Sequence, residues 1–194
     1  SMYLIKTVYS FIISLFCIFL IHEYPFYPVQ LTLISAVCVG IPSFFLAIEP
    51  NYTKVEKGFL LKVFRNALPS GICVWINITF LIMLSDIFDL DFDIFRLTIV
   101  AVTGYLNLRL LYNVSKPLTM MRKVLVSTCF IVFYVLLLLF RDFFLLTKIR
   151  FLSFLFVGLL IFADSYITEF LEGIYDYFVK VYRNKRSSVS FEKE

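Results

Sequence analysis

The sequence predicts an all-α membrane protein, and its composition and the layout of its apolar residues indicate that class. Of the 194 residues, 61% are hydrophobic, 19% are aromatic and only 16% are charged. The mean hydropathy is +0.90. The apolar residues gather in runs long enough to cross roughly 30 Å of hydrocarbon at about 1.5 Å per helical residue. A soluble domain of this composition would expose far too much apolar surface, which excludes soluble enzymes and soluble binding modules.

Six apolar stretches predict a six-transmembrane-helix bundle. They cover residues 3–21, 29–48, 67–84, 97–114, 124–140 and 151–171. The first has no small-residue cleavage site after it, so we expect a retained span and not a signal peptide. Ser1 before Met2 suggests a trimmed chain. We expect a transmembrane domain over residues 1–172 and an amphipathic basic tail over 173–194, which begins with a short interfacial C-terminal helix.

The distribution of Lys and Arg predicts the orientation of the bundle. An even number of spans puts both termini on one side of the membrane. If that side is the cytoplasm, the basic residues of the 54–65 loop and of the tail lie inside, and few basic residues lie outside. This asymmetry is typical of cytoplasmic segments. We therefore expect a multi-pass plasma-membrane protein with both termini cytoplasmic.

The second stretch carries the main irregularity of the sequence. Residues 29–48 contain no charge, but Gly40 and Pro42 interrupt the run near its centre. A proline removes one N–H and clashes with the carbonyl a turn earlier, so we expect the helix to kink or unwind locally. Transporters use such breaks near the bilayer midplane to coordinate small cations. The alternative is a kink that only helps helices to pack.

Two charged residues are expected inside the membrane. Arg109 in the fourth stretch and Asp164 in the sixth should lie at similar depth, and either alone would cost several kcal/mol in hydrocarbon. We expect them to form a pair, which either holds the helices together or takes part in transport. Asn77 and Asn107 could form hydrogen bonds to neighbouring helices.

The order P-x-Q-L-T-x-I-S, followed by G-I-P-x-F-F-L-A-x-E-P-N, covers residues 28–51. It resembles the sixth transmembrane helix of bacterial P-type cation-transporting ATPases, in the calcium-exporter-like group that includes cation-transporting ATPase E. Residues 3–20 resemble the end of the fifth helix of that family, and 60–81 resemble the approach to its seventh. The resemblance implies that the six helices correspond to the family's fifth to tenth.

The resemblance also implies a cation site. In calcium pumps of this family the sixth helix carries ion-ligating Asn and Asp residues around the same G-x-P, and the matching positions here are Ser35 and Val39. The usual acidic ligand is therefore absent. The ligands implied are Ser35, the main-chain carbonyls near Val37, Cys38 and Val39, and Ser14 from the preceding helix. Such a neutral site would bind a divalent ion weakly without a glutamate from the family's fourth helix.

The sequence contains no D-K-T-G-T phosphorylation motif, Walker A loop, G-x-G-x-x-G or H-E-x-x-H. We expect no cofactor in this chain, whereas the parent pump would use ATP and Mg²⁺. The predicted function is the C-terminal half of the ion-translocation domain of an ATP-driven cation pump, with calcium as the candidate ion. The expected partners are a divalent or monovalent cation, the lipid bilayer and the N-terminal and catalytic part of the pump, with no nucleic acid. The alternatives are a non-catalytic membrane protein or regulatory subunit, and a small passive ion carrier.

Overall fold

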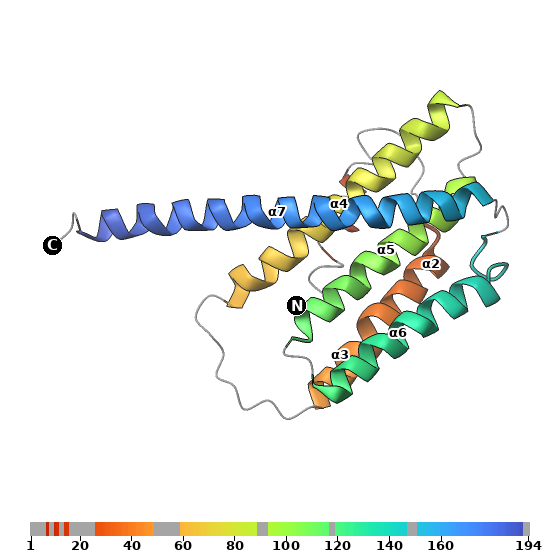
Figure 1. Cartoon of the computed structure of the whole chain (residues 1–194), viewed down its shortest axis with the longest axis horizontal. Coiled ribbons are helices and arrows are strands. Elements are labelled where there is room, and N and C mark those ends of the chain that lie inside the picture. Colours follow the sequence, from red (N-terminus) through yellow and green to blue (C-terminus); the bar gives the residue numbers. More distant parts are fainter. Residues whose placement is uncertain are drawn as a thin grey trace.

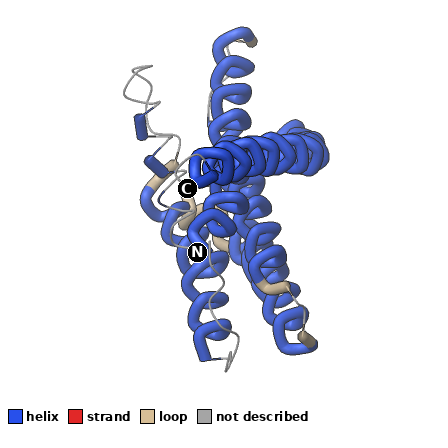
Figure 2. The backbone as a smooth tube through the Cα atoms, turned by 90° about the vertical axis from the view of Figure 1, so that its left-hand side faces the viewer, coloured by secondary structure: helices blue, strands red, loops and turns tan. Residues whose placement is uncertain are grey.

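The computed structural model describes residues 7, 10, 11, 14, 15, 26–48, 59–88, 93–116, 119–146 and 151–191, and its elements there are all helical (Figure 2). Five stretches of this part are long and apolar enough to cross a membrane: Pro28–Ile48, Leu68–Ile87, Ile94–Val114, Met120–Leu139 and Ser153–Val181. The predicted class, a multi-pass helical membrane protein, is confirmed. The first predicted span, 3–21, lies almost entirely outside the described residues. The count of six and the family's helix numbering therefore stay predictions.

The second predicted span consists of three consecutive pieces. The helix α2 (Pro28–Leu33) begins with a proline, whose missing N–H costs nothing at the first helical position. A π-helix, η1 (Ile34–Gly40), follows, and α3 (Ile41–Ile48) completes the span. The next span belongs to α4 (Phe59–Ile87), which contains Pro69 and remains α-helical throughout.

The helix α5 (Asp93–Val114) lies at the centre of the bundle. It packs against α4, η1, α6 (Met120–Leu139) and α7 (Phe151–Phe191), and Figure 1 shows it between α7 and the α2–α3 span. Most of its residues are buried, whereas most of α6 and α7 face outwards. The outward-facing sides of α6 and α7 are rich in exposed Phe, Leu and Ile side chains, as a lipid-facing surface requires.

The last helix is longer than the sequence predicts. α7 has 41 residues and runs without interruption from the last predicted span into the tail (Figure 1), so the expected separate interfacial helix is not a separate element. Gly173 is the only helix-weakening residue near the expected boundary, and no proline follows it. Extending an existing helix costs far less than nucleating a new one, which explains why the helix continues.

A side-chain hydrogen bond ties the start of the second span to the turn after α6. The side chain of Gln30 is fully buried, and its Nε2 donates to the carbonyl of Phe144 at 2.9 Å. In the same turn Leu145 has a φ of 57°, a left-handed conformation that costs an L residue roughly 1–2 kcal/mol. The bond from Gln30 fixes the carbonyl next to this strained residue and helps the turn to keep its shape.

We expect Gly104→Ala to destabilise the bundle by about 1–3 kcal/mol through overpacking. A Cβ atom at this position of α5 would lie 2.1 Å from Cζ of Phe133 on α6, a ring that is completely buried. The matched control is Gly158→Ala, because a Cβ atom there meets nothing within 4 Å. Chemical unfolding in detergent micelles measures both variants. Equal stability of the two would contradict the close packing of α5 on α6.

Candidate functional site

The π-helix η1 changes the main-chain hydrogen bonding directly before Pro42. The N–H of Ile41 donates to the carbonyl of Ala36, five residues earlier, and not to Val37, four residues earlier. Pro42, which would close the next π-helical ring on Val37, has no N–H. Neither helical donor is therefore available to the Val37 carbonyl. Inside a membrane, a carbonyl without a helical hydrogen-bond donor needs another donor or a cation as its partner.

Gly40 allows the main chain to pass close to itself at the same place. A Cβ atom at Gly40 would lie 3.3 Å from the main-chain oxygen of Ser35, which is tighter than ordinary van der Waals contact. Pro69 in α4 is also inside a spanning helix, yet α4 has no π-helical stretch. A glycine near a proline is not sufficient for this form, because α4 also carries Gly71 two residues from Pro69. In the second span Gly40 and Pro42 accompany a π-helix, a form that occurs often at functional sites.

The structure places the predicted ligands as follows. The hydroxyl of Ser35 is partly buried and donates to the carbonyl of Leu31, so its oxygen still has a free lone pair. Val37, Cys38 and Val39 are buried within η1. Ser14 is exposed, and most of the span around it lies outside the described residues. No group of three or more His, Cys, Asp and Glu residues in the described part of the chain could hold a metal ion.

Asn107 adds an oxygen atom to this region. Its Nδ2 donates to the carbonyl of Thr103 at 2.8 Å, while its Oδ1 is buried and has no hydrogen-bond partner in the described part of the chain. Asn107 is two residues from Arg109 and therefore roughly 200° around α5 from the face that meets α7. Because α5 also packs against η1, this acceptor lies on a helix that adjoins the π-helix.

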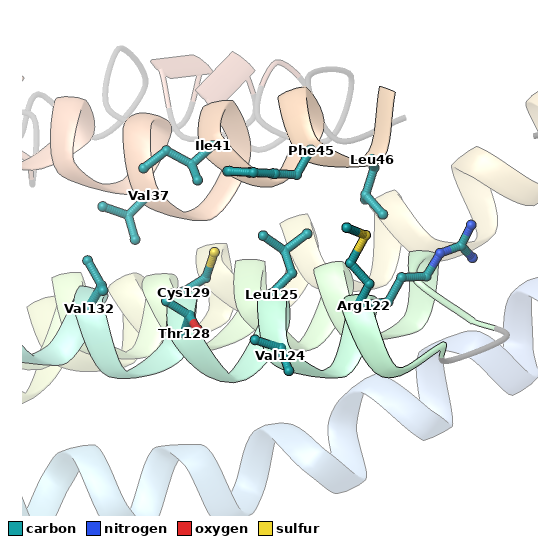
Figure 3. A pocket seen from close by; sticks show the side chains of 11 residues that line it. Val37, Ile41, Phe45, Leu46, Arg122, Val124, Leu125, Thr128, Cys129 and Val132 are labelled. Atoms are coloured by element: carbon teal, nitrogen blue, oxygen red, sulfur yellow. The ribbon is translucent and has the colours of Figure 1, made fainter. Parts of the chain in front are cut away.

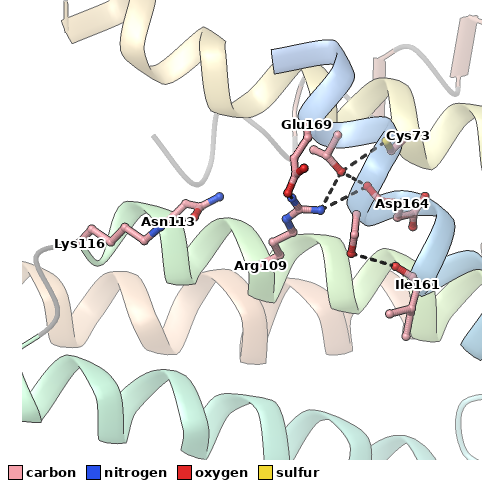
Figure 4. Close-up of polar contacts among 9 residues, drawn as sticks. Cys73, Arg109, Asn113, Lys116, Ile161, Asp164 and Glu169 are labelled. Carbon is pink, nitrogen blue, oxygen red and sulfur yellow. Dashed lines mark hydrogen bonds and ion pairs between the residues drawn. The ribbon is translucent and has the colours of Figure 1, made fainter. Parts of the chain in front are cut away.

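A second polar cluster joins α4, α5 and α7 (Figure 4). Asp164 on α7 is completely buried, and both of its carboxylate oxygens lie 3.0 Å from Nδ2 of Asn77 on α4. Arg109 on α5 donates from Nη1 to the main-chain carbonyl of Asp164 at 3.2 Å and to Oγ1 of Thr168 at 3.0 Å. The structure therefore brings Arg109 and Asp164 together through a main-chain oxygen, and the carboxylate meets Asn77.

The guanidinium of Arg109 also has an ionic partner. Nη2 lies 3.9 Å from Oε1 of Glu169, whose side chain is largely exposed. The hydroxyl of Thr168 donates to the carbonyl of Asp164 and lies 3.8 Å from Sγ of Cys73 on α4. Three helices thus share one hydrogen-bonded network with nearly balanced charge, which lowers the cost of keeping Asp164 away from water.

Two helix segments outside the bundle core are joined by an exposed ion pair. Nε and Nη2 of Arg65, at the start of α4, each lie 2.7 Å from a carboxylate oxygen of Asp176 on α7. This hydrogen bond raises the pKa of Arg65. The pair is too exposed to add much stability. It does place the first turns of α4 and the distal part of α7 at the same end of the molecule.

Comparison with known proteins gives matches over part of the chain. Over 89 residues, 42% of the chain, it is 38% identical to a protein of Streptococcus pneumoniae called probable cation-transporting ATPase exp7. Over 84 residues, 38% of the chain, it is 33% identical to the calcium-transporting ATPase CtpE of Mycolicibacterium smegmatis and 31% identical to CtpE of Mycobacterium tuberculosis. The chain is related in sequence to bacterial cation-transporting ATPases. The predicted resemblance to P-type ATPases of this kind is confirmed.

The relationship covers a small part of each relative. The matched residues make up 11% of exp7 and of the M. smegmatis CtpE, and 10% of the M. tuberculosis CtpE. No family model and no solved structure matches the chain.

Sequence reasoning did not find the carboxylate's actual partner. Asn77 was recognisable in the sequence, since an amide inside an apolar stretch is expected to form a hydrogen bond. Its partner could have been on any neighbouring helix. Thr168 and Cys73 carried no signal that separates them from ordinary core residues. Their roles become visible only when three helices are placed together.

We expect Asn77→Leu to destabilise the bundle by about 1–3 kcal/mol, because it leaves the buried Asp164 carboxylate without its two hydrogen bonds. Asn77→Leu combined with Asp164→Leu should recover much of this loss, since no unpaired charge remains. A double-mutant cycle of unfolding free energies in micelles measures the coupling. Simple addition of the two single effects would show that the two side chains do not interact.

Proposed function

We propose that this chain forms the C-terminal half of the membrane ion-translocation domain of an ATP-driven cation pump, with calcium as the candidate ion. The observation that carries the proposal is the π-helix η1 directly before Pro42, in the middle of a membrane-spanning segment. Two relatives are named calcium-transporting ATPases, which supports calcium. The rest of the pump would supply the preceding membrane helices and the catalytic domains, which would hydrolyse ATP with Mg²⁺.

In this proposal the ion is held by oxygen atoms around η1. The ligands are Oγ of Ser35 and the main-chain carbonyls near Val37, Cys38 and Val39, with Ser14 from the preceding helix. The Val37 carbonyl has neither helical donor, and the unpartnered Oδ1 of Asn107 on the adjoining α5 is a further candidate. These oxygens are all neutral, whereas Ca²⁺ sites in proteins usually combine carbonyls with negatively charged carboxylates. The site would therefore be completed by an acidic residue from the rest of the pump.

Both termini are proposed to be cytoplasmic, in the plasma membrane. The ion pair between Arg65 and Asp176 supports a common side for the first turns of α4 and the distal part of α7. Both segments are rich in Lys and Arg, which favours the cytoplasmic side.

Cation binding by the chain and by the full-length ATPase to which it belongs tests the proposed function. We expect saturable Ca²⁺ binding by the full-length protein and little by the chain alone, because the neutral half-site lacks the charge that Ca²⁺ requires. Pro42→Ala in the full-length protein restores an N–H donor in the break, so we expect it to weaken Ca²⁺ binding by roughly tenfold. Isotope binding to purified protein in micelles measures all three.

The matched control is Pro69→Ala, which removes a proline from the regular helix α4 and should leave the affinity unchanged. Equal losses from both substitutions would remove the π-helix from the site. Tight binding by the chain alone would favour a complete carrier over one half of a pump.

The proposed orientation makes a separate prediction for the loop after α4. Asp86 is exposed at the end of that helix, so a cysteine introduced by Asp86→Cys should react with an impermeant maleimide added to intact cells. Of the four native cysteines, Cys38, Cys73 and Cys129 are buried and should react little. Cys17 lies outside the described residues and is replaced by serine in the protein that is labelled. Labelling of Asp86→Cys only after lysis would place this loop in the cytoplasm and reverse the topology.

A further inference from the structure

An apolar groove runs between the second span and α6 (Figure 3). The groove, which we call the α3–α6 groove, has a cavity volume of about 310 Å³. Its walls carry Val37 and Ile41 on one side and Leu125 and Val132 on the other, and Arg122 lies at its end. Several lining side chains, among them Phe45 and Val124, are exposed on the outer surface of the bundle. The groove thus reaches the outer surface of the described part of the bundle.

The charged end and the apolar length of the groove together define the chemistry of an occupant. Arg122 presents a guanidinium with five N–H donors, and its Nη1 is held by the main-chain carbonyl of Ser115 at 3.2 Å. Lys116, shortly before α6, and Lys123, in the first turn of α6, are both exposed. The first turn of α6 contains no acidic residue. Positive charge at one end of an apolar groove complements a molecule with an anionic head and a hydrocarbon chain.

The length of the groove matches one leaflet of a bilayer. It extends along α6 from Arg122 to Val132, which is roughly 15 Å at the helical rise per residue. This is about half of the hydrocarbon thickness. A phospholipid with its phosphate at Arg122 would therefore reach the middle of the membrane with its acyl chain, beside Val37 of the π-helix.

We propose that the α3–α6 groove binds an anionic phospholipid. The phosphate lies at Arg122, with Lys123 adding to the positive charge, and one acyl chain lies along Ile41, Leu125 and Val132. The lipid contacts the span that contains η1, and it is distinct from the transported cation.

Tryptophan fluorescence can measure occupancy of the groove directly, because Trp75 is the only tryptophan in the chain. Trp75→Phe together with Phe45→Trp places a single reporter in the groove wall. Reconstituted into phosphatidylcholine vesicles, this reporter should be quenched by brominated phosphatidylglycerol with an affinity about fivefold higher than by brominated phosphatidylcholine. Adding Arg122→Gln should bring the ratio close to one. Inorganic phosphate in excess should not displace the lipid, because it has no acyl chain.

The control is Arg141→Gln, which removes an exposed arginine just beyond the other end of α6 and should leave the lipid preference unchanged. Equal quenching by the two lipids, or a preference that survives Arg122→Gln, would overturn the proposal. Weak quenching by both lipids together with cross-linked dimers would show that a second copy of the chain fills the groove.

A second measurement needs no substitution in the groove. The unaltered chain, purified in micelles that contain equal amounts of the two lipids, should retain phosphatidylglycerol in native mass spectrometry. Retention of both lipids in equal amounts would contradict the proposal, whatever the folding of the reporter variant.

Discussion

A main-chain carbonyl in the hydrocarbon core of a membrane has no water to bond to, and the arrangement around Pro42 follows from this constraint. Pro42 has no N–H to donate within its helix. In the π-helix η1 the N–H of Ile41 donates to the carbonyl of Ala36 and not to that of Val37. Gly40 lies two residues before this proline, and the absence of a Cβ there allows the close approach of the Ser35 carbonyl.

The same constraint explains the opposite side of α5. A buried carboxylate and a buried guanidinium each cost several kcal/mol if left alone, so Asp164 and Arg109 are surrounded by Asn77, Thr168 and Glu169. Because these groups come from α4, α5 and α7, none of the three helices can turn or slide without breaking a hydrogen bond. The cluster therefore fixes the relative positions of three helices.

Much of this arrangement is visible in the sequence, because each signal is local. Apolar runs of spanning length predict the helices, and the Gly40–Pro42 pair marks the irregular span. The single charges Arg109 and Asp164 stand out against apolar surroundings, and their similar depth predicts that they meet. The partner of each polar atom is not local information. Asn77 could have bonded to any neighbour, and the continuation of α7 past residue 172 depends on helix propagation, which the change from apolar to basic residues conceals.

The two sides of α5 differ in what a movement would cost. On the side of α4 and α7, any displacement separates charged and hydrogen-bonded groups in a dry interior, which is expensive. On the side of η1, α3 and α6 the contacts are largely apolar, and the α3–α6 groove leaves about 310 Å³ that side chains of the described residues do not fill. A displacement of α3 along α6 would mainly exchange one set of apolar contacts for another, and the hydrogen bond from Gln30 to the carbonyl of Phe144 is the polar contact that opposes it. In the proposed pump, movement would therefore cost least in the span that contains η1, while α4, α5 and α7 form the frame against which that span moves.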